Sequence, residues 1–239
     1  MTLNIESIAT LTDGVLRVTL PLSADGLISL DDCDRFAELL NSPPDSAHVV
    51  VIESNAESFC LGRERSAATV HELPGEVERL VAVNQALRNT RLVSIAKVQG
   101  DAAGFGVGLA ALSDIALAAS TAKFSFPEVN IGLAPVLVLA WLPQLVGRRE
   151  AFRLTATGAA ISAARAAELD IISESVDAAG LDERVAAVVE TLLPHDPRVH
   201  QEIRDFLRIS EQATEEEATE LAKSRLVIGS LRRQAPPRA

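Results

Sequence analysis

The chain has 239 residues, a length that predicts one large domain or one domain with an appendage. Hydrophobic residues make up 48% of the chain, but no apolar run approaches the roughly 20 residues that span a bilayer. The start lacks the pattern of a signal peptide, and two cysteines make no disulfide framework. We therefore expect a cytoplasmic protein. The net charge of −11 argues against a partner that is nucleic acid or an anionic membrane.

The first part of the chain predicts strands that alternate with helices. Period-two alternation and β-branched runs predict four strands, at 14–21, 48–54, 92–100 and 115–120. Apolar residues at helical spacing predict helices at 29–42 and 75–90, the first capped by Ser29 and Asp32. A short helix is expected to start near Gly106. This order favours an α/β fold with largely parallel pairing.

From Trp141 onward the pattern changes. Apolar and charged residues alternate at helical periods through "LPQLVGRREAFRLTATG", "SAARAAELDI" and the segments that follow. We therefore expect a core at 1–140 that carries the site, followed by a helical region at 141–239 whose faces are available for packing between subunits.

Two loops follow buried strands, at 57–64 and 98–114. Loops at the carboxyl ends of parallel strands are where α/β sheets place ligands, and two outward backbone N–H groups there can stabilise an oxygen that gains negative charge. Downstream, Glu128 follows a proline in an apolar segment, where burial would raise the pKa of its carboxyl and suit it to proton transfer. The alternatives are tight helix–strand packing for the glycines and a solvated turn for Glu128.

An ordered set of motifs resembles one known family. "VVVIESNAESFCLGRE" and "SIAKVQGDAAGFGVGLAALSDIALAASTAKFSFPEVNIGLAP" are similar to the enoyl-CoA hydratase/isomerase, or crotonase, family. Its pattern is Phe-x-x-Gly-x-Asp, Gly-x-Ala-x-Gly-x-Gly, Asp-Ile, Pro-Glu and Gly-x-x-Pro, and the order is far more specific than one glycine motif. The resemblance implies a crotonase-like spiral of ββα units with a helical C-terminal region that builds homotrimers, often paired into hexamers.

The resemblance also implies the site. It assigns the two N–H groups of an oxyanion hole to Leu61 and Phe105, with the thioester carbonyl oxygen of an acyl-CoA between them. Gly62, Gly104 and Gly106 would let the backbone approach the substrate and turn into the helix. Coenzyme A would arrive as part of the substrate, so neither a separate cofactor nor a metal is expected.

One departure from the family pattern bears on the reaction. Hydratases of this family carry two glutamates; the second matches Glu128, but the first falls at Gly108, which has no side chain. Losing one general acid–base group typically costs ~10²–10⁴ in rate. The pattern therefore favours an isomerase, in which one glutamate moves a proton between C2 and C4. The family's Gly-Ala-Gly-Gly-Thr-Gln-Arg stretch is also replaced, by "VLVLAWLPQL".

Several alternatives remain at this point. Within the family they are a one-glutamate hydratase, a decarboxylase or a hydrolase. Outside catalysis, the alternative is a non-catalytic acyl-CoA-binding subunit. A nucleotide binder ranks last, because the loop lacks the full Gly-x-Gly-x-x-Gly spacing. Arg63 and Arg65 are candidates for the positive charge that CoA phosphates need. His71 is interpreted as a surface histidine and Cys60 as a packing residue.

Overall fold

The computed structural model describes residues 3–5, 8–67, 69–211 and 213–234. Its largest sheet has seven strands in the order β1-β2-β3-β5-β7-β9-β12. These are β1 (Leu3–Ile5), β2 (Ala9–Thr12), β3 (Val15–Leu20), β5 (Val49–Ser54), β7 (Val93–Val98), β9 (Ile115–Ala119) and β12 (Glu174–Val176). Pairing is antiparallel from β1 to β3 and parallel from β3 to β12, which confirms the predicted α/β class.

Two smaller sheets lie beside the largest one. One has the order β11-β10-β8 and the other pairs β4 with β6. Their strands are β4 (Leu27–Ile28), β6 (Gly62–Arg63), β8 (Ala102–Ala103), β10 (Lys123–Ser125) and β11 (Ile161–Ser162). These short strands were not predicted, because two or three residues carry no periodicity.

The helices follow the predicted order in the first part of the chain. The first four helical segments are α1 (Leu30–Asn41), α2 (Leu73–Asn89), α3 (Phe105–Ala111) and the 3-10 helix η1 (Pro127–Ile131). The later ones are α4 (Val136–Leu139), α5 (Leu142–Val146), α6 (Arg148–Thr157), α7 (Ala163–Glu168), η2 (Ala178–Gly180), α8 (Leu181–Leu192), α9 (Pro197–Ser210) and α10 (Glu215–Gln234). As expected, the Ser29 side chain caps α1 by accepting from the Asp32 N–H at 3.1 Å.

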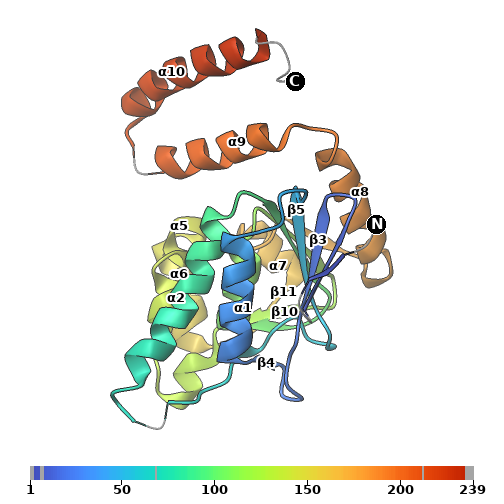
Figure 1. The fold of residues 1–239 in the computed structure, drawn as a ribbon. Coiled ribbons are helices and arrows are strands. Elements are labelled where there is room, and N and C mark those ends of the chain that lie inside the picture. Colours follow the sequence, from blue (N-terminus) through green and yellow to red (C-terminus); the bar gives the residue numbers. More distant parts are fainter. Residues whose placement is uncertain (1–2, 6–7, 68, 212, 235–239) are drawn as a thin grey trace. The chain divides into compact units, whose positions relative to one another are not determined.

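Both faces of the parallel strands are covered. The side chains of β5 explain why: Val50 and Ile52 join the core that contains α1, α2 and α3, whereas Val49 and Val51 join a second core under α8. Successive side chains of a strand point to opposite faces, so a continuous β-branched run fits a strand buried on both sides. Figure 1 shows α1 and α2 side by side on one face of the sheet.

The chain divides into two compact units, residues 1–194 and 195–239. The predicted boundary at 140/141 is wrong, because α5 to α8 and β12 complete the sheet and cores of the first unit. The prediction that everything after 141 is helical is also incomplete, since β11 and β12 lie there. "ESV" pairs with β9 and extends the parallel sheet by one strand.

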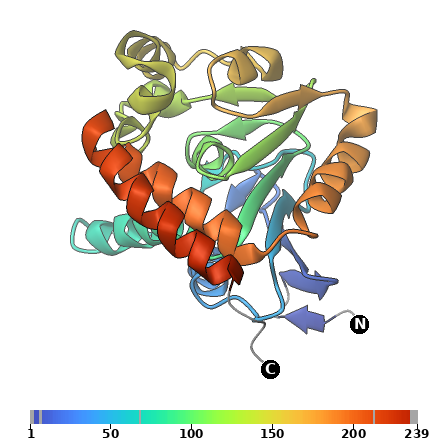
Figure 2. The ribbon, with the colours of Figure 1, turned by 90° about the horizontal axis from the view of Figure 1, so that it is seen from above.

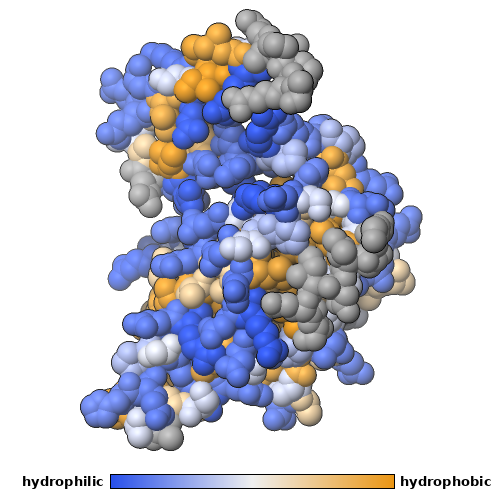
Figure 3. Space-filling model, viewed as in Figure 1, coloured by the Kyte–Doolittle hydropathy of each residue, from blue (hydrophilic) through white to orange (hydrophobic). Residues whose placement is uncertain are grey.

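The second unit is a helical hairpin of α9 and α10, which run alongside each other in opposite directions (Figures 1 and 2). None of its described side chains is buried, and apolar ones are exposed along both helices. Figure 3 shows hydrophobic side chains gathered over α10. Among the described residues, no helix combines the length and hydropathy needed to cross a membrane.

Candidate functional site

The two predicted loops meet at the start of α3. Cys60 forms a parallel bridge with Ala102, and its carbonyl accepts from the Ala103 N–H at 2.9 Å. A Cβ added at Gly106 would lie 2.0 Å from the Cys60 carbonyl oxygen, and one at Gly100 would lie 1.9 Å from that of Glu57. Only glycine permits this approach of two backbones, so the glycines of the second loop serve to bring the first loop against α3.

The structure corrects the assignment of Leu61. Its N–H donates to the Gly26 carbonyl at 2.8 Å, so this donor is already used inside the protein. The assignment was carried over by position from the family motif, and the pairing of this loop with Gly26 is not visible in that motif. Leu61 is 38% exposed, and its side chain lies beside Gly26, where an added Cβ would come within 2.9 Å of Cδ1.

The pairing of β6 identifies a different donor on the same loop. Arg63 pairs with Ile28 of β4, and the following N–H, of Glu64, donates to the Ile28 carbonyl at 2.8 Å. Backbone N–H groups alternate in direction along a strand, so the Arg63 N–H points away from β4. Gly62, at φ +134°, changes the direction of the chain between Leu61 and this strand.

Phe105 occupies the position expected of the second donor. It is the first residue of α3, and the first intrahelical bond runs from the Gly108 N–H to the Gly104 carbonyl. The N–H of a first helical residue has no acceptor within its own helix, so that of Phe105 is directed outward. Gly104 makes the turn into α3 at φ +51°, a conformation that favours glycine.

Glu128 lies at this same turn. It belongs to η1, and a Cβ added at Gly104 would come within 2.6 Å of its Oε1. The residue is half-buried, and its Oε2 is buried without a hydrogen-bond partner among the described residues. Burial raises the pKa of the Glu128 carboxyl, against the opposing effects of its own backbone N–H and the charge of Arg65. The expected proton-transfer group is thus present beside the start of α3.

Gly108, where the family's first glutamate would stand, faces an aromatic ring. A Cβ added there would lie 3.6 Å from Cζ2 of Trp141. The Trp141 side chain is 5% exposed and belongs to the main core with Val138 and Leu142. Trp141 is therefore a core residue.

The side chain of Arg63 is committed to an internal ion pair. Its guanidinium donates to Glu76 Oε2 at 2.7 Å, while Glu76 Oε1 accepts from the N–H groups of Ser66 and Ala67 at 2.5 and 2.7 Å. Burial raises the pKa of the Glu76 carboxyl, but these N–H groups and the Arg63 charge outweigh it and hold that pKa below its usual value. Arg63 is therefore not available to CoA phosphates through its guanidinium, whereas Arg65 is exposed.

Sequence reasoning missed Glu76, although a signal exists. Glu76 lies on the same face of α2 as the buried Leu80, Val83 and Leu87, at spacings of four, seven and eleven residues. A carboxylate on an apolar helix face needs a partner, and Arg63 supplies it. His71 is exposed, in line with its interpretation as a surface histidine.

The thiol of Cys60 lies in the same loop but is buried. Desolvation raises the pKa of Cys60 to about 11, and its Sγ lies 3.2 Å from the Gly62 carbonyl. A thiol in this state stays protonated near neutral pH and is a poor nucleophile. This supports the packing role that the sequence indicated.

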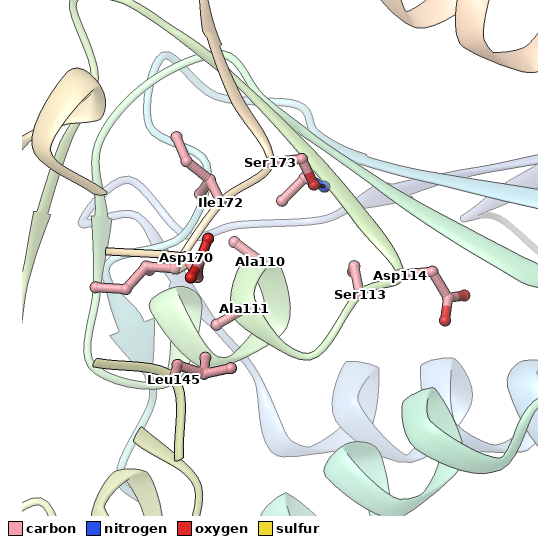
Figure 4. Close-up of a pocket in the computed structure, with 10 residues that line it drawn as sticks. Ala110, Ala111, Ser113, Asp114, Leu145, Asp170, Ile172 and Ser173 are labelled. Carbon is pink, nitrogen blue, oxygen red and sulfur yellow. Dashed lines mark hydrogen bonds between the residues drawn. The ribbon is translucent and has the colours of Figure 1, made fainter. Parts of the chain in front are cut away.

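A separate hollow lies at the other end of α3 (Figure 4). It has a volume of about 250 Å³ and is formed by Ala110 and Ala111 of α3 together with Leu145, Asp170 and Ile172. None of the candidate site residues lines it. Among the described residues, no cluster of histidine, cysteine and carboxylate side chains has the arrangement of a metal site.

Comparison with known proteins identifies the family and the fold. Residues 29–232 match the family model described as enoyl-CoA hydratase/isomerase. A probable enoyl-CoA hydratase of Mycobacterium bovis is 28% identical over 183 residues, which cover 75% of this chain and 71% of the relative.

Solved structures share the fold. An enoyl-CoA hydratase/isomerase family protein from Silicibacter pomeroyi superposes with a TM-score of 0.88 at 24% identity, covering 93% of this chain and 98% of that one. A putative enoyl-CoA hydratase from Thermobifida fusca, solved in complex with CoA, has a TM-score of 0.82 at 25% identity and covers 95% of this chain and 94% of its own.

Proposed function

We propose, starting from the fact that this chain belongs to the enoyl-CoA hydratase/isomerase family, that it moves a double bond within an acyl-CoA thioester. Glu128 removes a proton from C2 of a 3-enoyl-CoA, and the electron pair of that C–H bond moves into the thioester to form an enolate. The same carboxyl then returns the proton at C4, which leaves a C2=C3 double bond. Protons and electrons balance without any further reactant.

The observation that carries this proposal is the single carboxylate beside the start of α3. Glu128 Oε2 is buried without a hydrogen-bond partner in the described part of the chain, and burial raises the pKa of its carboxyl. A base with a raised pKa both accepts and returns a proton near neutral pH more readily than an ordinary glutamate. Gly108 offers no second carboxylate, which disfavours the two-acid addition of water.

The thioester oxygen would be held by two backbone donors. The Phe105 N–H, directed outward from the first turn of α3, keeps the role expected from the sequence. The Arg63 N–H replaces that of Leu61, which is occupied by Gly26. Donors that are already positioned before the reaction stabilise the developing negative charge without reorganisation, and loss of one typically costs ~10²–10³ in rate.

The solved relative in complex with CoA supports an acyl-CoA as the small-molecule substrate. The phosphates of CoA are anionic, and this chain also carries a negative net charge of −11. A local positive charge is therefore required to bind them. Arg65 is exposed and follows the Arg63 loop, and it takes the place that the sequence gave jointly to Arg63 and Arg65. No further cofactor is needed, because CoA comes with the substrate.

The test is Glu128→Gln, which keeps the size of the side chain and removes its basicity. Isomerisation of a 3-enoyl-CoA should fall by at least ~10²-fold, while the affinity for a saturated acyl-CoA stays within twofold of wild type. Glu183→Gln, an exposed carboxylate on α8, is the matched control and should keep full activity. Wild-type protein that hydrates a 2-enoyl-CoA but does not isomerise a 3-enoyl-CoA would refute the isomerase proposal in favour of a one-glutamate hydratase.

A further inference from the structure

Two positions at the start of α3, Gly104 and Gly108, carry no side chain. Gly104 and Gly108 are four residues apart and joined by the first hydrogen bond of the helix, at 3.3 Å. Residues at this spacing lie on the same side of a helix. The space beside Gly104 holds the Glu128 carboxylate, and the space beside Gly108 holds the Trp141 ring. The carboxylate and the indole thus lie beside two glycines that flank the first turn of α3.

The position of the indole is fixed by packing. Trp141 lies between α4 and α5, its backbone N–H donates to the Val138 carbonyl at 3.1 Å, and the residue is 5% exposed. Its nearest approach to Gly108 is ordinary van der Waals contact, so the ring fills this space without a clash. A methyl group at 108 would only touch the ring, whereas a longer side chain would have to displace it.

The chemistry of this face bears on what happens to an enolate or an enoyl product. Water adds to a double bond only when a polar group holds it near the carbon that it attacks. Glycine and an aromatic ring edge supply no such group, and the buried oxygen of Glu128 is left without a partner in the described chain. An apolar ring at this place occupies volume that an ordered water would otherwise fill.

We infer that Trp141 is the specificity-determining residue of this site, whose indole keeps water away from the carbons beside Glu128 so that they exchange only a proton. The inference rests on the proposed function, because it explains why the C2=C3 product leaves as an enoyl-CoA and not as a 3-hydroxyacyl-CoA. Trp141 acts by covering the α3 face at Gly108, and it takes no part in the proton transfer itself.

The first experiment measures the ratio of hydrated to isomerised product from a 3-enoyl-CoA. Trp141→Leu should raise this ratio at least tenfold, whereas Trp141→Phe, which keeps an aromatic cover, should stay within about threefold of wild type. Phe152→Leu removes an exposed aromatic ring on α6 and is the matched control, with no change expected. An unchanged ratio in Trp141→Leu, with acyl-CoA affinity retained, would overturn the inference.

The second experiment adds a carboxylate at the covered position. Gly108→Glu alone should hydrate a 2-enoyl-CoA no better than wild type, because the indole occupies the space its side chain needs. Gly108→Glu combined with Trp141→Ala should hydrate at least tenfold faster than either single variant. Equal hydration by Gly108→Glu in both backgrounds would show that the ring does not control this space.

A third measurement does not depend on whether a variant at position 141 folds. Trp141 is the single tryptophan of the chain, so its fluorescence reports this site alone in the wild-type protein. We expect a pH titration of the emission that disappears in Glu128→Gln and an emission protected from acrylamide quenching. If no titration is seen, the two residues do not share the site and the inference fails, even where Glu128→Gln abolishes isomerisation. If the titration is seen but the wild type does not isomerise, the proposed reaction fails instead.

Discussion

The Arg63 guanidinium and the Glu76 carboxylate form an ion pair of 2.7 Å that ties the first site loop to α2. The side chain of Glu76 is 5% exposed and that of Arg63 is 20% exposed, so the pair is largely shielded from water. The same carboxylate accepts the N–H groups of Ser66 and Ala67. The residue that offers one proposed donor to the substrate is thus held through its own side chain.

Removing the charge of Glu76 should loosen this loop. Glu76→Gln should lower the free energy of unfolding by about 1–3 kcal/mol, because the partly buried Arg63 loses its counter-ion and one set of N–H donors loses a charged acceptor. Urea denaturation at neutral pH measures this. Glu78→Gln, on the exposed side of the same helix, should change stability by less than about 0.5 kcal/mol. Equal stabilities of the two variants would contradict the role of the pair.

The contribution of Glu76 should also depend on pH. Its carboxyl has a pKa below the ordinary 4.5, so folding favours the charged form and the stabilisation is fully present above the pKa of the unfolded chain. As the pH falls below 4.5 and through the folded pKa, the difference in unfolding free energy between wild type and Glu76→Gln should shrink. A difference that grows on acidification would show that the carboxyl is protonated in the native state.

Arg65 should tune the base. Its positive charge lowers the pKa of the Glu128 carboxyl against the larger effect of burial, so Arg65→Gln should raise that pKa further. The base works only when deprotonated, and the acid limb of the kcat/KM profile for isomerisation should therefore move to higher pH. Arg35→Gln on α1 removes the same charge from an exposed pair with Asp32 and should leave the limb in place. A limb that moves to lower pH in Arg65→Gln would contradict this account.

The contact between the two loops should tolerate no side chain at its centre. Gly106→Ala would place a Cβ 2.0 Å from the Cys60 carbonyl oxygen and should cost at least about 1–3 kcal/mol as well as most of the activity. Gly75→Ala is the matched control: its Cβ meets nothing within 4 Å in the first turn of α2, and it should stabilise the protein by about 0.4–1 kcal/mol. Thermal and urea unfolding compare them, and a neutral Gly106→Ala would mean that the loops separate easily.

The hairpin of α9 and α10 should assemble with other copies. Val199, Ile203 and Leu207 are spaced by four residues on α9 and are each more than half exposed, an apolar stripe that a monomer would leave in water. Light scattering should give a trimer or hexamer at micromolar concentration, and Ile203→Glu should lower the mass. Gln201→Glu adds the same charge at another exposed position and should not. A monomeric wild type would refute this expectation.

The long, strongly periodic elements were predictable from the sequence. The strand at 48–54 and the helices at 29–42 and 75–90 appear within two residues of their predicted bounds, because their apolar patterns report a core that the fold then builds. The strand β12 was missed because its three residues have no period of their own and depend on pairing with β9. Its strand character comes from tertiary structure.

The site was predictable where side chains carry the chemistry and less so where the backbone does. Glu128 follows from an acid in an apolar segment, and the structure puts it beside Gly104. Leu61 was assigned by its position in the family motif, which does not show the direction of an N–H group; the pairing with Gly26 and Ile28 determines that direction. Backbone direction emerges only when the strands pair.

The backbone contact between Cys60 and Gly106 means that the position of the proposed donors and the choice of acyl group depend on different parts of the residue at 105. The first depends on its main chain and the second on its side chain. The proposed donors are main-chain groups whose positions are set by glycines, so every replacement of Phe105 except proline keeps the N–H group. That side chain is half-buried and packs against the core. Substitutions of this side chain would therefore change which acyl groups fit the proposed site while the proposed main-chain donor stays in place.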